Sequence, residues 1–359
     1  MSESGGVINV PVHSTRGKGT HTILQAINAA LAKAMELDEN VVLIGEDVGK
    51  NGGVFCVTEG LWERFGDDRI KDTPLSEQAI VATATGASMG GVKIVVEIQF
   101  SGFSYSAFEH FVSHTARMRA RTLGTLTCPL VVRMPYGNRI HAPEHHSEAN
   151  EAFFAHIPAL KIVVLSTVEN AYGLTLAAIN DPDPVIVFEP SVLYRSVRGN
   201  IVDDGKPMEL GKCRVHQEGS DITLITWGSM LYECIDAAAL VATENISVEI
   251  IDVQTISPLD IDTVVASVKK TGRFAVVQEA PSFCSVASEV TAQLWERISE
   301  YIRAPSVRIA GANVGMPLYR RENLVVPNAL RIALDIRSII KVEFPFEMPF
   351  AAYAGMRAH

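Results

Sequence analysis

The sequence predicts an α/β protein of two domains, the first with a mostly parallel sheet between helices and the second a smaller α/β sandwich. Its 359 residues exceed one average domain and suffice for two. Strand-like and helix-like patterns alternate along the first half and again after residue 220, which is typical of crossover units around a parallel sheet. Between the two series, residues 190–220 are rich in Gly and Pro and lack clear periodicity, which predicts an inter-domain connection.

The elements of the first series follow from their apolar patterns. Residues 22–35 place apolar side chains on one helical face. Residues 41–44 form a short apolar run that suits a strand buried on both faces, and Ser76 is a candidate helix cap. We expect further strands at 93–99, 130–134, 161–165 and 185–189, and further helices at 76–87, 108–118 and 168–179.

The second series begins after the connection. We expect strands at 222–227, 247–253, 273–278 and 306–310, and helices at 230–243, 260–270 and 286–300. The predicted organisation is a flexible N-terminus at 1–20, a first domain at 21–200, a connection at 201–220, a second domain at 221–340 and a tail at 341–359.

Composition excludes several classes of protein. The net charge of −10 disfavours nucleic-acid binding, and the basic run Arg117, Arg119 and Arg121 fits a solvated helix face. Five cysteines without metal or redox spacing predict reduced, buried thiols in an intracellular protein. No secretory signal and no run of eighteen apolar residues occurs, so we expect a cytoplasmic protein that crosses no membrane, or an organelle-matrix protein if a targeting segment was removed.

The common nucleotide-binding motifs do not occur. Neither G-x-G-x-x-G nor G-x-x-x-x-G-K-[ST] is found, so direct NAD binding is not supported. Two acidic residues stand at candidate positions instead. Glu46 directly follows the strand predicted at 41–44, and ligands of open α/β sheets bind beyond the carboxyl ends of strands. Glu77 falls in the first turn of a predicted helix, where the helix dipole alone would also favour it.

The segment 141–148 holds three histidines and two glutamates. His141 and His145 have the spacing of a helical metal pair, but Pro143 between them disfavours the helix. The segment therefore indicates a loop-borne catalytic or binding histidine rather than a zinc site, with a polar surface loop as the alternative.

Six segments together resemble one enzyme family. They are GEDVGKNGGVFCVTEGL at 45–61, DTPLSEQAIV at 72–81, EIQFSGFSYSAFEH at 97–110, HHSEANEAFFAHIPALKIV at 145–163, FEPSVLYR at 188–195 and KTGRFAVVQEAP at 270–281. In this order they resemble the β subunits of the thiamine-diphosphate-dependent decarboxylating component of 2-oxoacid dehydrogenase complexes. The resemblance covers about residues 20 to 335 and looks closest to the branched-chain (2-oxoisovalerate) type.

The resemblance implies a fold and a shared cofactor. The first domain would be a pyrimidine-binding domain of the thiamine-diphosphate-binding fold, and the second a transketolase C-terminal-type domain. Gly66-Asp67-Asp68 is the nearest approach to the family's diphosphate and Mg²⁺ motif, and no Asn-Asn follows it. The resemblance therefore implies that Mg²⁺ and the diphosphate are held by a separate α subunit.

The resemblance also assigns site residues. Glu77 matches the glutamate that contacts the N1′ atom of the aminopyrimidine, and His146 matches the histidine near the reacting carbon. Phe103 matches the aromatic position that stacks on the ring, where relatives often carry Tyr. The other pocket positions are Glu46, Leu75 and Gln99. A structural K⁺ would be held by the backbone carbonyls of Cys128, Leu130, Val131, Ala178, Asp181 and Asp183.

The expected activity is oxidative decarboxylation of a branched-chain 2-oxoacid such as 3-methyl-2-oxobutanoate, with acyl transfer to the lipoyl group of an acyltransferase component. The expected assembly is an α2β2 heterotetramer. The alternatives are a pyruvate or acetoin dehydrogenase β subunit, a transketolase-type transferase fragment and a non-catalytic assembly subunit.

Overall fold

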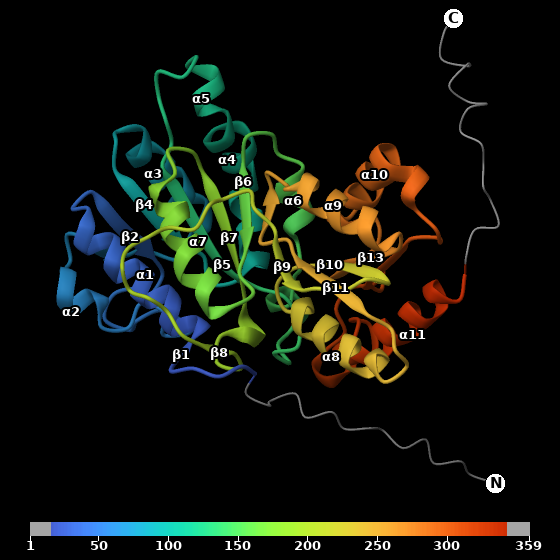
Figure 1. The fold of residues 1–359 in the computed structure, drawn as a ribbon. Helices are drawn as coiled ribbons and strands as arrows, with labels where there is room; N and C mark the ends of the chain where they lie inside the picture. Colours follow the sequence, from blue (N-terminus) through green and yellow to red (C-terminus); the bar gives the residue numbers. More distant parts are fainter. Residues whose placement is uncertain (1–15, 343–359) are drawn as a thin grey trace, which may run out of the picture.

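Two sheets with helices on both faces organise residues 16–342, the part of the chain that this computed structural model describes (Figure 1). The first sheet has seven strands in the order β12-β6-β7-β5-β4-β2-β3, and all neighbours are parallel except β12 and β6. These strands are β2 (Val41–Gly45), β3 (Ile70–Asp72), β4 (Lys93–Glu97), β5 (Leu130–Tyr136), β6 (Lys161–Val164), β7 (Val185–Pro190) and β12 (Thr255–Ser257). The predicted α/β class is confirmed.

The first sheet is covered on both faces. Helices α1 (Ile23–Leu37) and α7 (Val168–Asn180) pack together over one face, and each begins at a threonine whose side chain takes part in a capping box. Helix α3 (Glu77–Met89) lies over the other face. Shorter helices complete this half: α2 (Leu61–Phe65), α4 (Phe108–Ser113), α5 (Met118–Arg121) and α6 (Glu151–Ala155).

Two predicted helices differ in detail. The helix expected at 108–118 is broken, because α4 ends before His114 and a 3₁₀ turn precedes α5. Ser76 stands at the N-cap of α3 without a capping hydrogen bond from its side chain, and the helix runs on to Met89, where Gly90 follows.

A second correction concerns the cysteines: Cys56 and Cys284 are exposed, whereas all five thiols were expected to be buried.

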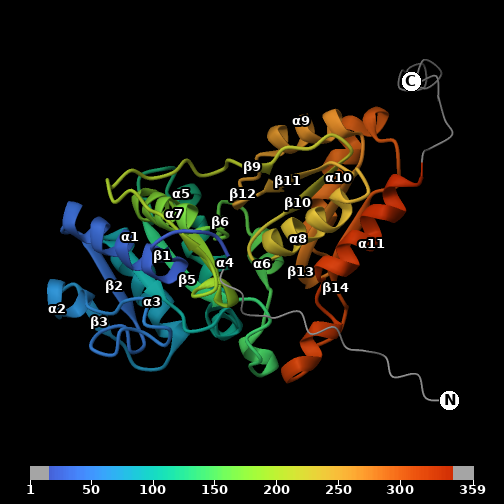
Figure 2. The same cartoon turned by 60° about the horizontal axis from the view of Figure 1, so that its bottom comes forward.

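The second sheet has the order β14-β13-β10-β11-β9, with β9 antiparallel. Figure 1 shows α9 and α10 on one side of it and α8 and α11 on the other, and Figure 2 shows the same separation. The strands are β9 (Arg214–Gln217), β10 (Ile222–Thr226), β11 (Val248–Asp252), β13 (Phe274–Pro281) and β14 (Val307–Gly311). The helices are α8 (Met230–Ala242), α9 (Ile261–Thr271), α10 (Val286–Ile298) and α11 (Ala329–Ile340).

The half of the protein around the seven-stranded sheet (the first half) and the half around the five-stranded sheet (the second half) are joined by a common apolar core and by strand β12. One apolar cluster runs from α3 and the first sheet to Trp227, α9 and α10 of the second half. Strand β12 falls in the predicted second domain yet pairs antiparallel with β6 and extends the first sheet. The structure therefore joins the two halves more closely than a flexible linker would.

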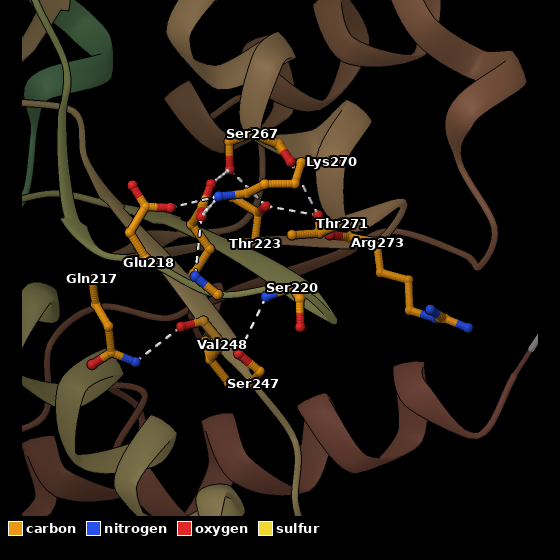
Figure 3. A network of polar contacts seen from close by, with 12 residues as sticks. Gln217, Glu218, Ser220, Thr223, Ser247, Val248, Ser267, Lys270, Thr271 and Arg273 are labelled. Carbon is orange, nitrogen blue, oxygen red and sulfur yellow. Dashed lines mark hydrogen bonds and ion pairs between the residues drawn. The ribbon is translucent and has the colours of Figure 1, made fainter.

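A polar network fastens the start of the second half to its sheet (Figure 3). Glu249 on β11 is 1% exposed and is bonded by Lys270, Ser267 and the Gly219 N–H. Lys270 also reaches Glu218, at 2.6 Å. A buried charge needs partners of this kind because desolvation alone would be costly.

The chain ends were expected to be a flexible N-terminus at 1–20 and a tail at 341–359. Most of both segments lies outside the described residues. Within 16–342, β1 (His21–Thr22) pairs with β8 (Arg198–Gly199). No helix of this part is long and apolar enough to cross a membrane.

Candidate active site

The candidate site lies where the parallel strands β2, β3 and β4 end. Gly45, the last residue of β2, is aligned with Asp72 of β3 and Glu97 of β4. The residues that follow therefore leave the sheet at one edge, where ligands of open α/β sheets bind. The predicted residues that follow these strands are Glu46, Leu75, Glu77, Gln99 and Phe103.

Two carboxylates, Glu46 and Glu77, lie close enough at this edge to influence each other. Glu46 is 7% exposed, and its Oε1 atom has no hydrogen-bond partner among the described residues. Burial raises the pKa of Glu46, the negative charges of Glu77 and Asp47 raise it further, and the Ser76 N–H lowers it. Glu77 is half-buried in the first turn of α3. The structure thus brings two predicted site residues to one corner.

Aromatic rings connect Phe103 to the histidine segment. The Phe103 ring centroid lies 5.1 Å from His146 and 5.2 Å from His145, and Phe100 lies 4.6 Å from His146. His146 is half-buried and its Nδ1 atom lacks a hydrogen-bond partner among the described residues, whereas His145 is exposed. His146 is therefore the histidine that faces inward.

A glycine allows this close contact. A Cβ atom on Gly102 would lie 2.3 Å from the His145 carbonyl oxygen, so only glycine lets the segment of Phe103 approach the histidine segment. The α3 helix packs against the same 3₁₀ segment, 101–107, which places Glu77 and Phe103 on touching elements.

The other predicted pocket residues differ in burial. Gln99 is half-buried just after β4. Leu75 is 80% exposed, so within this chain it lines no enclosed pocket. Leu75, which precedes the half-buried Glu77 by two residues, is therefore an exposed apolar side chain at this edge of the sheet.

Sequence reasoning did not find the charged network beneath the site. Arg133 on β5 donates to Glu97 at 2.8 Å and to both oxygens of Glu189, and Tyr194 donates to Glu189 at 2.5 Å. All four side chains are buried. The available signal was one charged residue near the end of each of three apolar strands. The network is connected to the site by Phe55, whose ring contacts Tyr194 in a tilted arrangement and Phe100 edge-on.

The histidine segment does not gather metal ligands. Among residues 16–342, the cluster with metal-ligand spacing is Glu109, His110 and His114 on and after α4. Residues 144–146 instead form a 3₁₀ turn that turns His146 toward Phe100. The interpretation of this segment as a loop that carries a catalytic or binding histidine stays a prediction.

The expected potassium corner already holds positive charge. Lys161 Nζ lies 2.6 Å from both Asp181 oxygens, and Arg119 Nε lies 2.6 Å from Asp183. The carbonyls of Cys128 and Ala178 accept N–H groups of the same chain. Two cations therefore balance the two carboxylates at this corner.

Two further sequence patterns do not form sites in this chain. Asp67 in the Gly66-Asp67-Asp68 turn accepts the Trp62 indole N–H at 2.5 Å. Residues 86–90 spell G-x-S-x-G, but Ser88 is buried inside α3. A nucleophile elbow needs a turn between strand and helix, so Ser88 is not placed for that chemistry.

Comparison with known proteins defines the class first. Residues 20–197 match the family model of the transketolase pyrimidine binding domain, and residues 211–332 match the transketolase C-terminal domain. A solved chain described as a split gene transketolase, inactive β4 tetramer, shares the fold with a TM-score of 0.74 at 18% identity, over 91% of this chain and 100% of that one. The protein is thus a two-domain α/β protein of transketolase type, as the resemblance predicted.

Sequence relatives define the family. The chain is 46% identical over 320 residues to the pyruvate dehydrogenase E1 component subunit beta of Acholeplasma laidlawii, covering 89% of this chain and 98% of the relative. It is 42% identical, with the same coverage, to the protein of that name from Bacillus subtilis (strain 168). The chain belongs to the β subunits of the thiamine-diphosphate-dependent E1 components of 2-oxoacid dehydrogenase complexes. These relatives do not support the branched-chain type that was expected, and they agree better with the pyruvate alternative.

Proposed function

We propose that this protein is the β subunit of a pyruvate dehydrogenase E1 component, which decarboxylates pyruvate oxidatively and transfers the acetyl group to a lipoyl group. The observation that carries the proposal is the meeting of Glu46, Glu77, Phe103 and His146 around one edge of the first sheet. The names of the similar E1 subunits support pyruvate over a branched-chain 2-oxoacid.

The residues at this edge fit an aminopyrimidine ring. Glu46 offers a buried oxygen that has no partner among residues 16–342, and Phe103 offers an aromatic ring on an element in contact with the helix of Glu77. Polar ring nitrogens and a flat π face are what such a set would bind. Gln99 and Leu75 follow the same strand ends and complete the proposed lining.

The chain's own residues then have distinct duties. When bound, thiamine diphosphate supplies the carbon nucleophile and holds the electron pair left by CO₂. Glu77 holds a proton at a pyrimidine ring nitrogen, and Phe103 fixes the plane of the ring. His146 holds the substrate and moves a proton near the reacting carbon, a role that imidazole side chains commonly take in catalysis.

We propose that a separate α subunit completes the site in an α2β2 heterotetramer. Leu75 supports this, because an exposed leucine next to the site is a surface that a partner chain would cover. The turn at Asp67 is bonded to Trp62, so we assign Mg²⁺ and the diphosphate to the α subunit. A lipoyl acyltransferase receives the acyl group, and we place the complex in the cytoplasm.

A structural K⁺ at the carbonyls of Cys128, Leu130, Val131, Ala178, Asp181 and Asp183 is a secondary proposal. It would join the positive charges that Lys161 and Arg119 already bring to this corner. Thermal midpoints of the α–β complex in KCl and in tetramethylammonium chloride of equal ionic strength test it, and equal midpoints would reject the ion.

The main test uses the co-purified α–β complex. We expect pyruvate to be turned over with a higher kcat/KM than 3-methyl-2-oxobutanoate, measured as substrate-dependent reduction of ferricyanide and as acylation of a lipoyl domain. The opposite preference would restore the branched-chain type. Ketol transfer between sugar phosphates without lipoyl acylation would favour the transketolase-type alternative.

A matched pair of variants tests the role of Glu77. Glu77→Gln should lower kcat by on the order of 100-fold or more, since it removes an acid–base group. Glu63→Gln is the control, because Glu63 is likewise an acid in the first turn of a helix, exposed on α2. Full activity of Glu77→Gln would leave only a non-catalytic assembly role for this carboxylate.

A further inference from the structure

A buried carboxylate of the second half, Glu322, holds the backbone that leads to His146. Glu322 is fully buried, and its Oε2 atom accepts the Arg139 N–H at 2.5 Å. Its Oε1 atom accepts the His141 N–H at 2.7 Å, and the His141 Nδ1 atom lies 2.9 Å from the same oxygen. One carboxylate thus binds two backbone amides that lie about 180 residues earlier in the chain.

The backbone at these amides has an unusual conformation. Arg139 has φ 72° and His141 has φ 59°, both in the left-handed region that side chains other than glycine seldom adopt. Such a conformation persists only where surrounding contacts enforce it, and it is concentrated at functional sites. Here the enforcing contacts come from the two oxygens of Glu322.

A second buried carboxylate, Glu279 at the end of β13, holds the start of the same loop. Its Oε2 atom accepts the Asn138 N–H at 2.9 Å and the Asn138 side-chain amide at 3.1 Å. A Cβ atom on Gly137 would lie 2.8 Å from Glu279 Oε1, so the loop approaches this carboxylate at a glycine. Arg139 adds contacts to Glu233, at 2.5 Å, and to the Pro327 carbonyl.

The far end of the loop is fixed to the first half. The Glu148 carbonyl accepts the Gly137 N–H at 2.8 Å and the Ser101 hydroxyl at 3.3 Å. The His146 N–H donates to the Pro143 carbonyl at 2.9 Å, which closes the turn that carries the imidazole. Residues 137–148 therefore form a closed loop that is held by the second half on one side and touches Phe103 on the other.

We infer that Glu322, supported by Glu279, is a positioning residue that sets where His146 stands for the reaction. The inference rests on the proposed function, in which His146 acts near the reacting carbon. Glu322 itself touches no reacting atom. Two amide donors need two acceptor oxygens, and the glutamine in Glu322→Gln would turn one of them into an NH₂ group facing a donor.

A double-mutant cycle in the α–β complex tests this inference. If Glu322 acts through His146, Glu322→Gln should lower kcat about 10-fold or more in the parent enzyme and less than twofold in the His146→Ala background. Thiamine diphosphate affinity, followed by fluorescence quenching, should stay within threefold because Glu46, Glu77 and Phe103 are untouched. Fully multiplicative losses in the cycle would overturn the inference.

The control is Glu249→Gln, which alters another buried carboxylate of the second half that does not touch the loop. It should keep the parent kcat per folded enzyme. If Glu322→Gln does not fold, Arg139→Ala removes the contacts to Glu233 and Pro327 from the same loop and enters the same cycle.

Amide hydrogen exchange separates this inference from the proposed function. Protection of the Arg139 and His141 amides should fall at least 10-fold in Glu322→Gln and stay unchanged in Glu249→Gln. Unchanged protection of these amides in Glu322→Gln would refute the role of Glu322 in holding the loop, even if the enzyme is a pyruvate dehydrogenase. If the two amides lose protection but the complex decarboxylates no 2-oxoacid, Glu322 holds the loop and the proposed function is rejected.

Discussion

Arg133 donates from Nε and Nη2 to the two carboxylate oxygens of Glu189, at 2.7 and 2.9 Å, with both side chains fully buried in the first sheet. A third donation from Nη1 reaches Glu97. Burial raises the pKa of Glu97, and the guanidinium acts against that rise. The planar fork of arginine is what allows one side chain to serve both acids.

Removing this arginine should be strongly destabilising. Arg133→Ala leaves two buried carboxylates without their cation, and breaking a buried pair typically costs about 3–5 kcal/mol. Arg119→Ala is the matched control, because its pair with Asp183 is partly exposed and should contribute less than about 1 kcal/mol. Denaturant unfolding of the complex measures both, and equal losses would show that burial does not govern the Arg133 network.

Two glycine-to-alanine substitutions should distinguish a glycine that allows two backbone segments to come close from one that only makes a helix more flexible. The added Cβ in Gly102→Ala would meet the His145 carbonyl oxygen at 2.3 Å, so we expect the histidine segment to shift and kcat to fall at least 10-fold. A Cβ on Gly86, which is exposed in α3, meets nothing within 4 Å, so Gly86→Ala should stabilise by about 0.8–1 kcal/mol. Steady-state kinetics and thermal unfolding measure the two effects. Parent activity in Gly102→Ala would contradict the assigned contact.

The match between sequence and structure was best where the information is local. The helix predicted at 22–35 is present because its apolar face is joined by the capping box of Thr22 and Gln25. The break at His114 was missed because the apolar stripe of residues 108–118 continues across it. Local patterns do not record a backbone turn that tertiary packing imposes.

Contacts between distant residues account for the rest of what was missed. Motif resemblance brought Glu77, Phe103 and His146 into one hypothesis, and the structure places them on touching elements. The resemblance gave no sign of Glu322, because the backbone amides that donate to it, those of His141 and Arg139, lie 181 and 183 positions away in the sequence. Leu75 was expected to line a pocket and is exposed, and the α subunit proposed above is the surface that would cover it.

We expect the ionised Glu46 side chain to lower the stability of the folded protein and to contribute to cofactor binding. Its raised pKa means that the folded state favours the protonated carboxyl, so its stabilising effect is present at low pH and is lost as pH rises through the folded pKa. Glu46→Gln should therefore raise the thermal midpoint at pH 8 and change it little at pH 4. The same variant should weaken thiamine diphosphate binding, as judged by titration of the α–β complex. A lower midpoint at pH 8 would show that the Glu46 carboxylate has a partner in the complex.

The contact between the two halves should make stability depend on pH near neutrality. Burial raises the pKa of Glu151, which accepts the Trp227 indole N–H at 3.1 Å, to about 7. Burial likewise raises the pKa of Asp252, which accepts the Ser166 hydroxyl at 2.9 Å, to about 7. Both acids have folded-state pKa values above their unfolded ones. Their contribution is therefore complete below pH of about 4 and is lost as pH rises through 7.

We expect the free energy of unfolding to fall between pH 6 and pH 8 by about 1.4 kcal/mol for each acid, because an acid with a folded-state pKa of about 7 is half-protonated on average over these two pH units. Glu151→Gln keeps an acceptor for Trp227 and removes the titration, so its stability curve should be flatter over this range. Asp252→Asn should act in the same way at the Ser166 contact. Urea unfolding of the complex at pH 6, 7 and 8 measures four proteins: the parent, the two single variants and the double variant that carries both changes. The contradicting outcome is a parent whose free energy of unfolding depends on pH as little as that of the double variant. Both carboxyl groups would then stay ionised in the folded protein, because the hydrogen bonds of their donors offset the cost of burial.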